Sequence, residues 1–125
     1  MSQKNVEIVR AIHDAWAKDV SPAHLIARDL EYVNPSYAVE AGTRHDRNAL
    51  DGVRDVYPDF RVEAQRYIDA GDEVVVIGIA RGTGASGVEV QLRQGYIWTI
   101  QDGQAIRFRW FNDPAEALEA VRLAE

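Results

Sequence analysis

The chain has 125 residues, a formal net charge of −6 at pH 7 and no cysteine. That length suits one domain with a single core, and the absence of thiols excludes disulfides, thiolate metal sites and cysteine nucleophiles. The acidic balance, with no basic stripe to oppose it, argues against a nucleic-acid partner. The apolar run at residues 74–77 is too short to span a bilayer, and residues 1–10 carry no apolar signal segment. We therefore expect one cytoplasmic domain over residues 1–125, without a membrane partner.

The N-terminal half of the chain has helical periodicity. Residues 3–18 predict an amphipathic helix, because apolar side chains recur on one broad face and charged side chains lie mostly opposite. Ser21 followed by Pro22 suits the cap and first position of a short second helix over about 22–29.

Two further elements are predicted before residue 60. Residues 31–34 predict a short strand that is stopped by Pro35. A third helix is predicted over about 47–57, with Asp46 as its cap and Pro58 at its end.

From Phe60 onward the apolar period changes to two, which indicates strands. The predicted elements are an alternating strand from Phe60, a turn at 70–72, strands over 73–81 and 88–100, a hairpin turn at Asp102-Gly103 and a strand over 106–110. Asp113 and Pro114 then predict the cap and first position of a short C-terminal helix over 115–123. This order predicts an α+β fold in which the helices pack on one face of a curved antiparallel sheet.

Residues 82–87 read Gly-Thr-Gly-Ala-Ser-Gly and so match the dinucleotide-binding pattern G-x-G-x-x-G. That pattern requires a following helix, whose N-terminus holds the pyrophosphate. Here residues 88–92 alternate as a strand does. We interpret the glycines as a hairpin loop, with the border of a pocket mouth as a second possibility, and expect no nucleotide cofactor.

Several segments carry a family resemblance through their order and spacing. They are Asn5–Arg10, Glu31–Pro35, Phe60–Glu63, Ile68–Val76, Trp98–Gly103 and Asp113–Glu119. Together they resemble the SnoaL-like branch of the nuclear transport factor 2-like superfamily. The resemblance implies a conical barrel: a strongly curved, mainly antiparallel sheet wrapped around N-terminal helices, with a short C-terminal helix and an apolar pocket. Members include ketosteroid isomerases, polyketide cyclases, limonene epoxide hydrolases, dehydratases and non-catalytic binders, so the fold alone does not give the function.

Strand alternation and the resemblance together predict the residues that line the pocket. The candidate ligand-pocket residues are His13, Trp16, Tyr57, Trp98, Phe108, Trp110 and Asn112. They are mostly aromatic, with a few polar tips, as a pocket for an apolar or polycyclic small molecule requires. The alternative is that these aromatic side chains simply fill the core.

The ketosteroid isomerase pattern needs a carboxylate base and an oxyanion hole made of a tyrosine and a protonated acid. In this chain Asn34 stands at the position of the base, Tyr96 at that of the acid and Trp16 at that of the tyrosine. An amide cannot take up a proton at neutral pH, so proton abstraction by that route is not expected. Tyr96 remains a candidate donor of a hydrogen bond to a ligand oxygen.

The limonene epoxide hydrolase pattern holds a water with Tyr-x-Asn, which Tyr32 and Asn34 reproduce. Its Asp-Arg-Asp relay is missing, because Gly78, Ala80 and Trp110 stand at those positions. Without the relay no carboxylate activates the water. The alternative for Tyr32 and Asn34 is structural, since an asparagine before proline is a common turn residue.

The other titratable residues give no stronger site. His24 is expected to face water, His45 to precede a helix cap, and His13 to lie at the surface or at a pocket rim. No spacing of histidines suits a metal, so we expect neither a metal nor another cofactor. The acids are expected in solvated turns, caps and faces: Glu40, Asp55, Asp69, Glu73 and Asp113.

The outward positions of the sheet carry charges of both signs. They are Glu63, Glu89, Gln91, Arg93, Arg107 and Arg109. Such a face is either solvated or paired across a two-fold axis, and the resemblance favours a homodimer through it.

Three functions stay open at this point. The first is a pocket protein that binds an apolar small molecule. The second is an enzyme of the isomerase, cyclase, dehydratase or epoxide hydrolase kind, with Tyr32, Asn34 and Tyr96 as catalytic candidates. The third is a non-catalytic dimerisation module.

Overall fold

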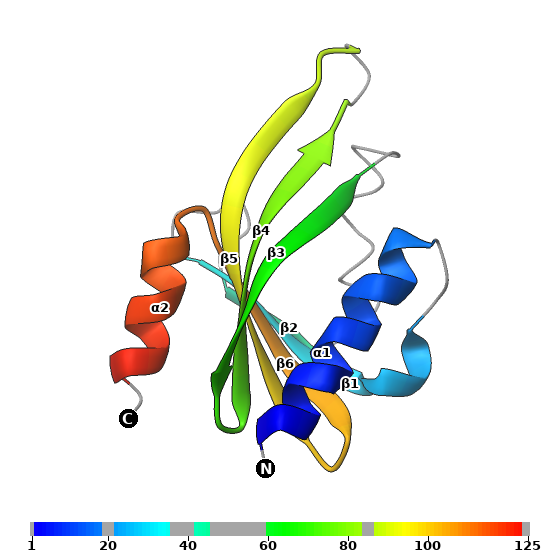
Figure 1. Ribbon diagram of the computed structural model, residues 1–125, viewed down its shortest axis with the longest axis vertical. Coiled ribbons are helices and arrows are strands. Elements are labelled where there is room, and N and C mark those ends of the chain that lie inside the picture. Colours follow the sequence, from blue (N-terminus) through cyan, green and yellow to red (C-terminus); the bar gives the residue numbers. More distant parts are fainter. Residues whose placement is uncertain (1, 19–21, 36–41, 46–59, 84–86, 124–125) are drawn as a thin grey trace.

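The computed structural model describes residues 2–18, 22–35, 42–45, 60–83 and 87–123. Within them the elements are α1 (Ser2–Ala17), the short 3-10 helix η1 (Ala23–Leu25), β1 (Ile26–Asn34), β2 (Gly42–His45), β3 (Arg61–Ala70), β4 (Glu73–Gly82), β5 (Val90–Gln101), β6 (Gln104–Phe111) and α2 (Pro114–Leu123). Figure 1 shows a strongly curved sheet with α1 and α2 on opposite sides of it. The predicted helix over 47–57 lies outside the described residues.

The six described strands form one sheet in the order β2-β1-β6-β5-β4-β3. All neighbouring pairs are antiparallel except β1 and β6, which run parallel. The predicted α+β class with a mainly antiparallel sheet is therefore confirmed. In the described part of the chain, β2 and β3 form the two edges, so the sheet is curved and open rather than a closed barrel.

The two helices pack on different faces of the sheet, which corrects the prediction of helices on one face. Along β4, Val74 and Val76 join the core beneath α1, whereas Val75 and Ile77 join a second core beneath α2. We call these the inner and the outer face. This arrangement explains the continuous apolar run of β4. A strand that is covered on both faces carries apolar side chains at successive positions rather than alternating apolar and polar ones.

The inner core is the larger of the two. Its buried members are Val9, Ile12, Ile26, Leu30, Val74, Val76, Tyr96, Trp98, Ile100, Ala105 and Phe108. They come from α1 and from strands β1, β4, β5 and β6, so helix α1 and the concave side of the sheet enclose them together.

The turns follow their predicted chemistry. Asp102 and Gly103 have φ angles of 52° and 80°, the left-handed conformation that a two-residue hairpin between β5 and β6 requires. The Asp113 carboxylate accepts a hydrogen bond of 2.9 Å from the Ala115 backbone N–H and so caps α2. Both predictions are confirmed.

The glycine segment joins two antiparallel strands, with Gly82 of β4 opposite Val90 of β5. Residues 84–86 lie outside the described part of the chain. Because a strand follows the glycines, the hairpin interpretation is confirmed.

The predicted helix over 22–29 is wrong. Only Ala23–Leu25 form a 3-10 turn, and β1 begins at Ile26. Ile26 lies opposite Ala105 of β6, and Leu30 is fully buried. An isolated helix of this length is marginal, so pairing with β6 and burial of these side chains override the local cap signal.

Candidate functional site

Aromatic side chains gather on the inner face where β1, β6 and β5 lie side by side. The strand register places Tyr32 and Trp98 opposite Phe108, and Tyr96 opposite Trp110. Phe108 is the centre of the group, with ring centroids 4.5 Å from Trp98, 5.7 Å from Tyr96 and 5.4 Å from Tyr32. The predicted inward direction of the aromatic residues on β5 and β6 is therefore confirmed.

Helix α1 places His13 and Trp16 against this aromatic layer. Their spacing of three residues puts both on the helix face that meets the sheet, and their rings lie 5.3 Å apart. The His13 ring also lies 5.9 Å from Trp98 and 6.3 Å from Tyr96, and 6.0 Å from Tyr67 of β3. His13 thus stands inside a cage of rings.

His13 is 4% exposed, so the expectation of a surface or rim position is wrong. Its Nε2 accepts a hydrogen bond of 3.1 Å from the indole Nε1–H of Trp98. Burial lowers the pKa of His13 to about 4, because an apolar environment disfavours the imidazolium ion. At neutral pH the ring is therefore uncharged and is a weak base.

Tyr96 belongs to a chain of buried and half-buried hydrogen bonds. Its hydroxyl donates to the Oε1 atom of Gln94 at 2.7 Å, and the Nε2 atom of Gln94 donates to the Oδ1 atom of Asn112 at 3.0 Å. Burial raises the pKa of Tyr96, with a smaller contribution from Tyr32, so the phenol stays protonated. Since the Tyr96 hydroxyl already donates its proton to Gln94, it can bind a further group only by accepting a hydrogen bond.

Besides Tyr67 of β3, the member of the site that sequence reasoning missed is Gln94. Its signal was available, because it lies two residues before Tyr96 and therefore on the same face of β5. A polar residue at an inward position was not interpreted as part of the site.

Tyr32 and Asn34, the Tyr-x-Asn pair, lie at the end of β1 and belong to the same aromatic layer. The Oδ1 atom of Asn34 accepts a hydrogen bond of 2.7 Å from the indole Nε1–H of Trp110, and Tyr32 packs on Phe108. The structure thus brings Tyr32, Asn34 and Trp110 together. Tyr57 lies outside the described residues.

Comparison with known proteins assigns this arrangement to a family. The model of the SnoaL-like domain matches residues 9–108. This chain belongs to the SnoaL-like domain family. Solved structures with the same fold support the assignment at the level of the fold.

Three such structures cover nearly all of this SnoaL-like domain. An NTF2-like protein of unknown function from Burkholderia pseudomallei is 23% identical, with 94% of this chain and 97% of that one covered and a TM-score of 0.73. TerC, co-crystallised with polyporic acid, is 24% identical, with 95% and 98% covered and a TM-score of 0.74. A putative SnoaL-like polyketide cyclase from Jannaschia sp. is 20% identical, with 96% and 92% covered and a TM-score of 0.71. No curated protein matches the chain significantly.

The interior of the SnoaL-like domain is uncharged as far as the structure describes it. Among the described residues the buried polar side chains are His13 and Gln94, and no carboxylate is buried. Nor does any group of three histidine or acidic residues in the described ranges come together as a metal site would require. A helix that could cross a membrane is likewise absent from these ranges.

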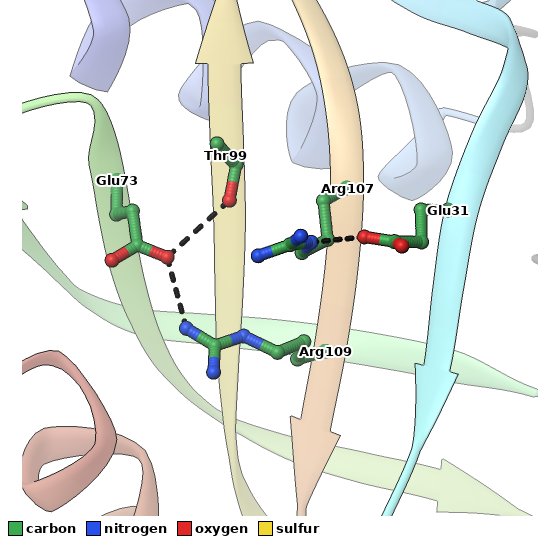
Figure 2. A network of polar contacts seen from close by, with 5 residues as sticks. All are labelled: Glu31, Glu73, Thr99, Arg107 and Arg109. Carbon is green, nitrogen blue, oxygen red and sulfur yellow. Dashed lines mark hydrogen bonds and ion pairs between the residues drawn. The ribbon is translucent and has the colours of Figure 1, made fainter. Parts of the chain in front are cut away.

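Of the acidic residues assigned to faces and turns, Asp69, Glu73 and Asp113 do lie there. Figure 2 shows Glu73 on the outer face, where its Oε2 accepts from Arg109 at 2.9 Å and from Thr99 at 3.3 Å. Arg107 pairs with Glu31 of β1 in the same row. The charges of the outer face are thus matched across four neighbouring strands. Glu40 and Asp55 lie outside the described residues.

Proposed function

We propose that the inner face of this SnoaL-like domain binds an apolar small molecule that contains aromatic or other unsaturated rings. The observation that carries the proposal is the aromatic layer between α1 and the sheet, in which the half-buried rings of Trp16 and Tyr32 adjoin the buried rings of Trp98 and Phe108. Such rings bind flat apolar ligands by contact with their faces and edges. The polar atoms among them fix the orientation of a ligand.

Exposed apolar side chains on β5 and just before it support the same proposal. Val88, Val90 and Leu92 are 65%, 39% and 48% exposed. In a regular strand they alternate in step with Gln94 and Tyr96 and so belong to the inner face. They extend this face toward the hairpin tip as an apolar approach for a ligand.

Binding is favoured over acid–base catalysis by the uncharged interior. A base that removes a proton near pH 7 needs a pKa near that value, whereas the pKa of His13 is lowered to about 4. The catalytic roles considered for Tyr32, Asn34 and Tyr96 therefore become roles in binding. TerC shares the fold and was co-crystallised with polyporic acid, which supports a small-molecule site on this fold.

We also infer that the domain forms a homodimer through its outer sheet face. Alternating charges there, such as Arg81 paired with Glu63 at 2.9 Å, suit a self-complementary surface. Sedimentation equilibrium at micromolar concentration should give the mass of two chains. The mass of one chain would contradict the dimer and leave the ligand proposal untouched.

Native mass spectrometry of the purified protein, followed by denaturation and identification of released molecules, tests the binding proposal. The expected result is an apolar ring compound bound once per chain, either carried through purification or added from an aromatic library. Tyr96→Phe and Asn34→Ala should weaken its binding without unfolding the domain. Equal affinity in both variants would place the ligand elsewhere, and the absence of any bound compound would contradict the proposal.

A further inference from the structure

Within the part of the chain that the structure describes, the first half of β5 is a further open edge of the sheet. Strand β4 accompanies β5 as far as Val90, which lies opposite Gly82. Strand β6 does not, because its last residue, Phe111, lies opposite Gly95. Among the described residues, 90–94 therefore pair with β4 alone. Figure 1 shows β5 continuing beyond the ends of β6 and α2 at this point.

The open edge presents the backbone groups of Gln91 and Arg93. In an antiparallel ladder, successive residues of a strand direct their N–H and C=O groups to opposite sides. The Ile100 N–H donates to the Asp72 carbonyl at 2.8 Å, on the β4 side of β5, and the register between the two strands is unbroken. Even-numbered residues of β5 therefore face β4, whereas Gln91 and Arg93 face the open edge. Such groups are a template for another strand.

The side chains on either side of Gln91 form a symmetric pattern. Val90 and Leu92 flank it on the inner face and are 39% and 48% exposed. Glu89 and Arg93 lie one position further out, on the outer face, and both are exposed. Arg93 makes no ion pair with any described residue. The edge thus carries two apolar side chains on one face and two opposite charges on the other, each pair centred on Gln91.

We propose that this edge of β5 is an interaction surface for a second copy of the chain. The second β5 strand adds antiparallel to the first, about a two-fold axis at Gln91. In this register Gln91 lies opposite Gln91 of the partner subunit, Val90 opposite Leu92 of the partner subunit, and Glu89 opposite Arg93 of the partner subunit. The two sheets then continue into one another.

This register matches backbone and side chains at the same time. The two Gln91 residues exchange backbone hydrogen bonds, because their N–H and C=O groups face the edge. Val90 and Leu92 then meet as non-hydrogen-bonded pairs, in which side chains lie closer together. Glu89 and Arg93 meet as opposite charges on both sides of the axis, as a self-complementary surface requires.

The charges also select this register over its neighbours. Moving the two-fold axis to Glu89 would place that carboxylate opposite its own copy, and moving it to Arg93 would place two guanidinium groups opposite one another. Like charges directly opposite in a sheet are destabilising. Charged side chains on an edge strand usually prevent pairing. Here their opposite signs and equal spacing permit one partner, which is the same edge of a second copy.

The edge is separate from the outer-face dimer proposed above, and it does not depend on the ligand proposal. It offers only a short, exposed stretch of each copy, and small interfaces of this kind are weak. We therefore expect edge pairing above the micromolar concentrations at which the outer-face dimer is tested. The expected change is a further doubling of mass.

Amide hydrogen exchange, followed by NMR at micromolar and at millimolar protein concentration, tests the backbone pairing. The N–H groups of Gln91 and Arg93 should exchange several-fold more slowly at the higher concentration, because they become hydrogen-bonded to the second copy. Those of Val90 and Leu92 face β4 and should change less. Exchange at Gln91 and Arg93 that is independent of concentration would overturn the inference.

Charge variants test the register by sedimentation equilibrium over the same range of concentration. Glu89→Arg and Arg93→Glu each bring like charges together, so each variant alone should lose the rise in mass. An equal mixture of the two should regain it, because every cross-strand pair is again of opposite sign. Glu7→Arg, the same charge change on an exposed position of α1, is the matched control and should associate as the wild type does.

The outcomes distinguish edge pairing from the other proposals. A wild-type mass that does not rise with concentration would overturn the inference, as would a rise that Glu89→Arg leaves unchanged. Recovery in the mixture would support the register, and it would also show that neither variant fails through unfolding. Failure of the outer-face dimer would change the starting mass from two chains to one and leave the expected doubling as it is.

Discussion

At the scale of single residues, His13 is held neutral by its burial. An imidazolium ion at this place would lose its hydration and would have to break the hydrogen bond from Trp98, since a protonated Nε2 no longer accepts. The loss of hydration lowers the pKa of His13 to about 4. Protonation of His13 therefore opposes folding.

Stability should fall as the pH falls through the window between about 6.5 and 4. In this window His13 binds a proton in the unfolded chain and not in the folded one, so the free energy of unfolding decreases with decreasing pH. The full effect is about 3 kcal/mol for a shift from 6.5 to about 4. Urea unfolding at several pH values measures it.

His13→Gln is the matched control for this effect, because glutamine does not titrate and still offers an oxygen to Trp98. The other titratable groups, including Asp14, Tyr67 and Tyr96 near the ring, are common to both proteins. The difference in free energy between the two should therefore shrink as the pH falls. Parallel curves would show that His13 is not buried as described.

Among the elements, the contact between α2 and β5 depends on the absence of a side chain. A Cβ atom at Gly95 would lie 2.7 Å from the Cβ of Ala117 and 3.1 Å from the Cα of Pro114. Neither atom is the end of a flexible side chain. Glycine at this position lets the helix approach the strand closely.

Gly95→Ala should therefore destabilise the domain by about 1–3 kcal/mol, as overpacking of a well-packed core does. Ala117→Gly alone should cost about 1 kcal/mol through helix propensity. Since the second change removes the atom that the first one meets, the double variant should be more stable than the sum of the two effects predicts. Thermal unfolding of the four proteins measures the coupling, and strict additivity would refute the contact.

The start of α2 offers a second test at this scale. Asp113→Ala removes the carboxylate that accepts from the Ala115 N–H and should cost about 1 kcal/mol. Asp113→Ser, which keeps a capping oxygen, should recover most of the loss. A loss of equal size in both variants would mean that the cap does not stabilise the helix.

The elements divide clearly into those that sequence could predict and those it could not. Helix 2–17, strands β3 to β6 and the Asp102-Gly103 turn follow from local periodicity and turn chemistry. The extension of β1 back to Ile26 does not, because it depends on parallel pairing with β6, nearly 80 residues away in the chain. The position of α2 on the outer face could be predicted only by interpreting the continuous apolar run of β4 as a strand that is buried on both faces.

For the whole molecule, the curved sheet separates two kinds of surface. The inner face carries the aromatic layer and the uncharged polar atoms. The outer face carries α2 and two neighbouring ion pairs, Glu73 with Arg109 and Arg107 with Glu31. The exposed pair of Arg107 with Glu31 contributes little to stability, whereas the pair of Arg109 with Glu73 is half-buried. Their effect is on the character of the outer surface, whereas the inner face supplies the binding chemistry.

The sequence predicts most of the residues that make up the site, but it does not predict which of them contact one another. Strand parity placed Tyr96, Trp98, Phe108 and Trp110 on one face. The bond between His13 and Trp98 joins residues 85 positions apart, and periodicity within α1 does not reveal such a partner. For that reason His13 was expected at a rim, although it is buried.

All three tryptophans of the chain, Trp16, Trp98 and Trp110, lie at the inner face. Their indole N–H resonances therefore report on the proposed site and on no other part of the molecule. Titration of nitrogen-15-labelled protein with aromatic ring compounds of two sizes, 9-fluorenone and 1-tetralone, is the most direct test of the central claim. The account predicts saturable shifts of the Trp98 and Trp110 indole signals, with the amide signals of α2 unchanged. Shifts confined to α2, or no saturable shift at the indoles with either compound, would contradict it.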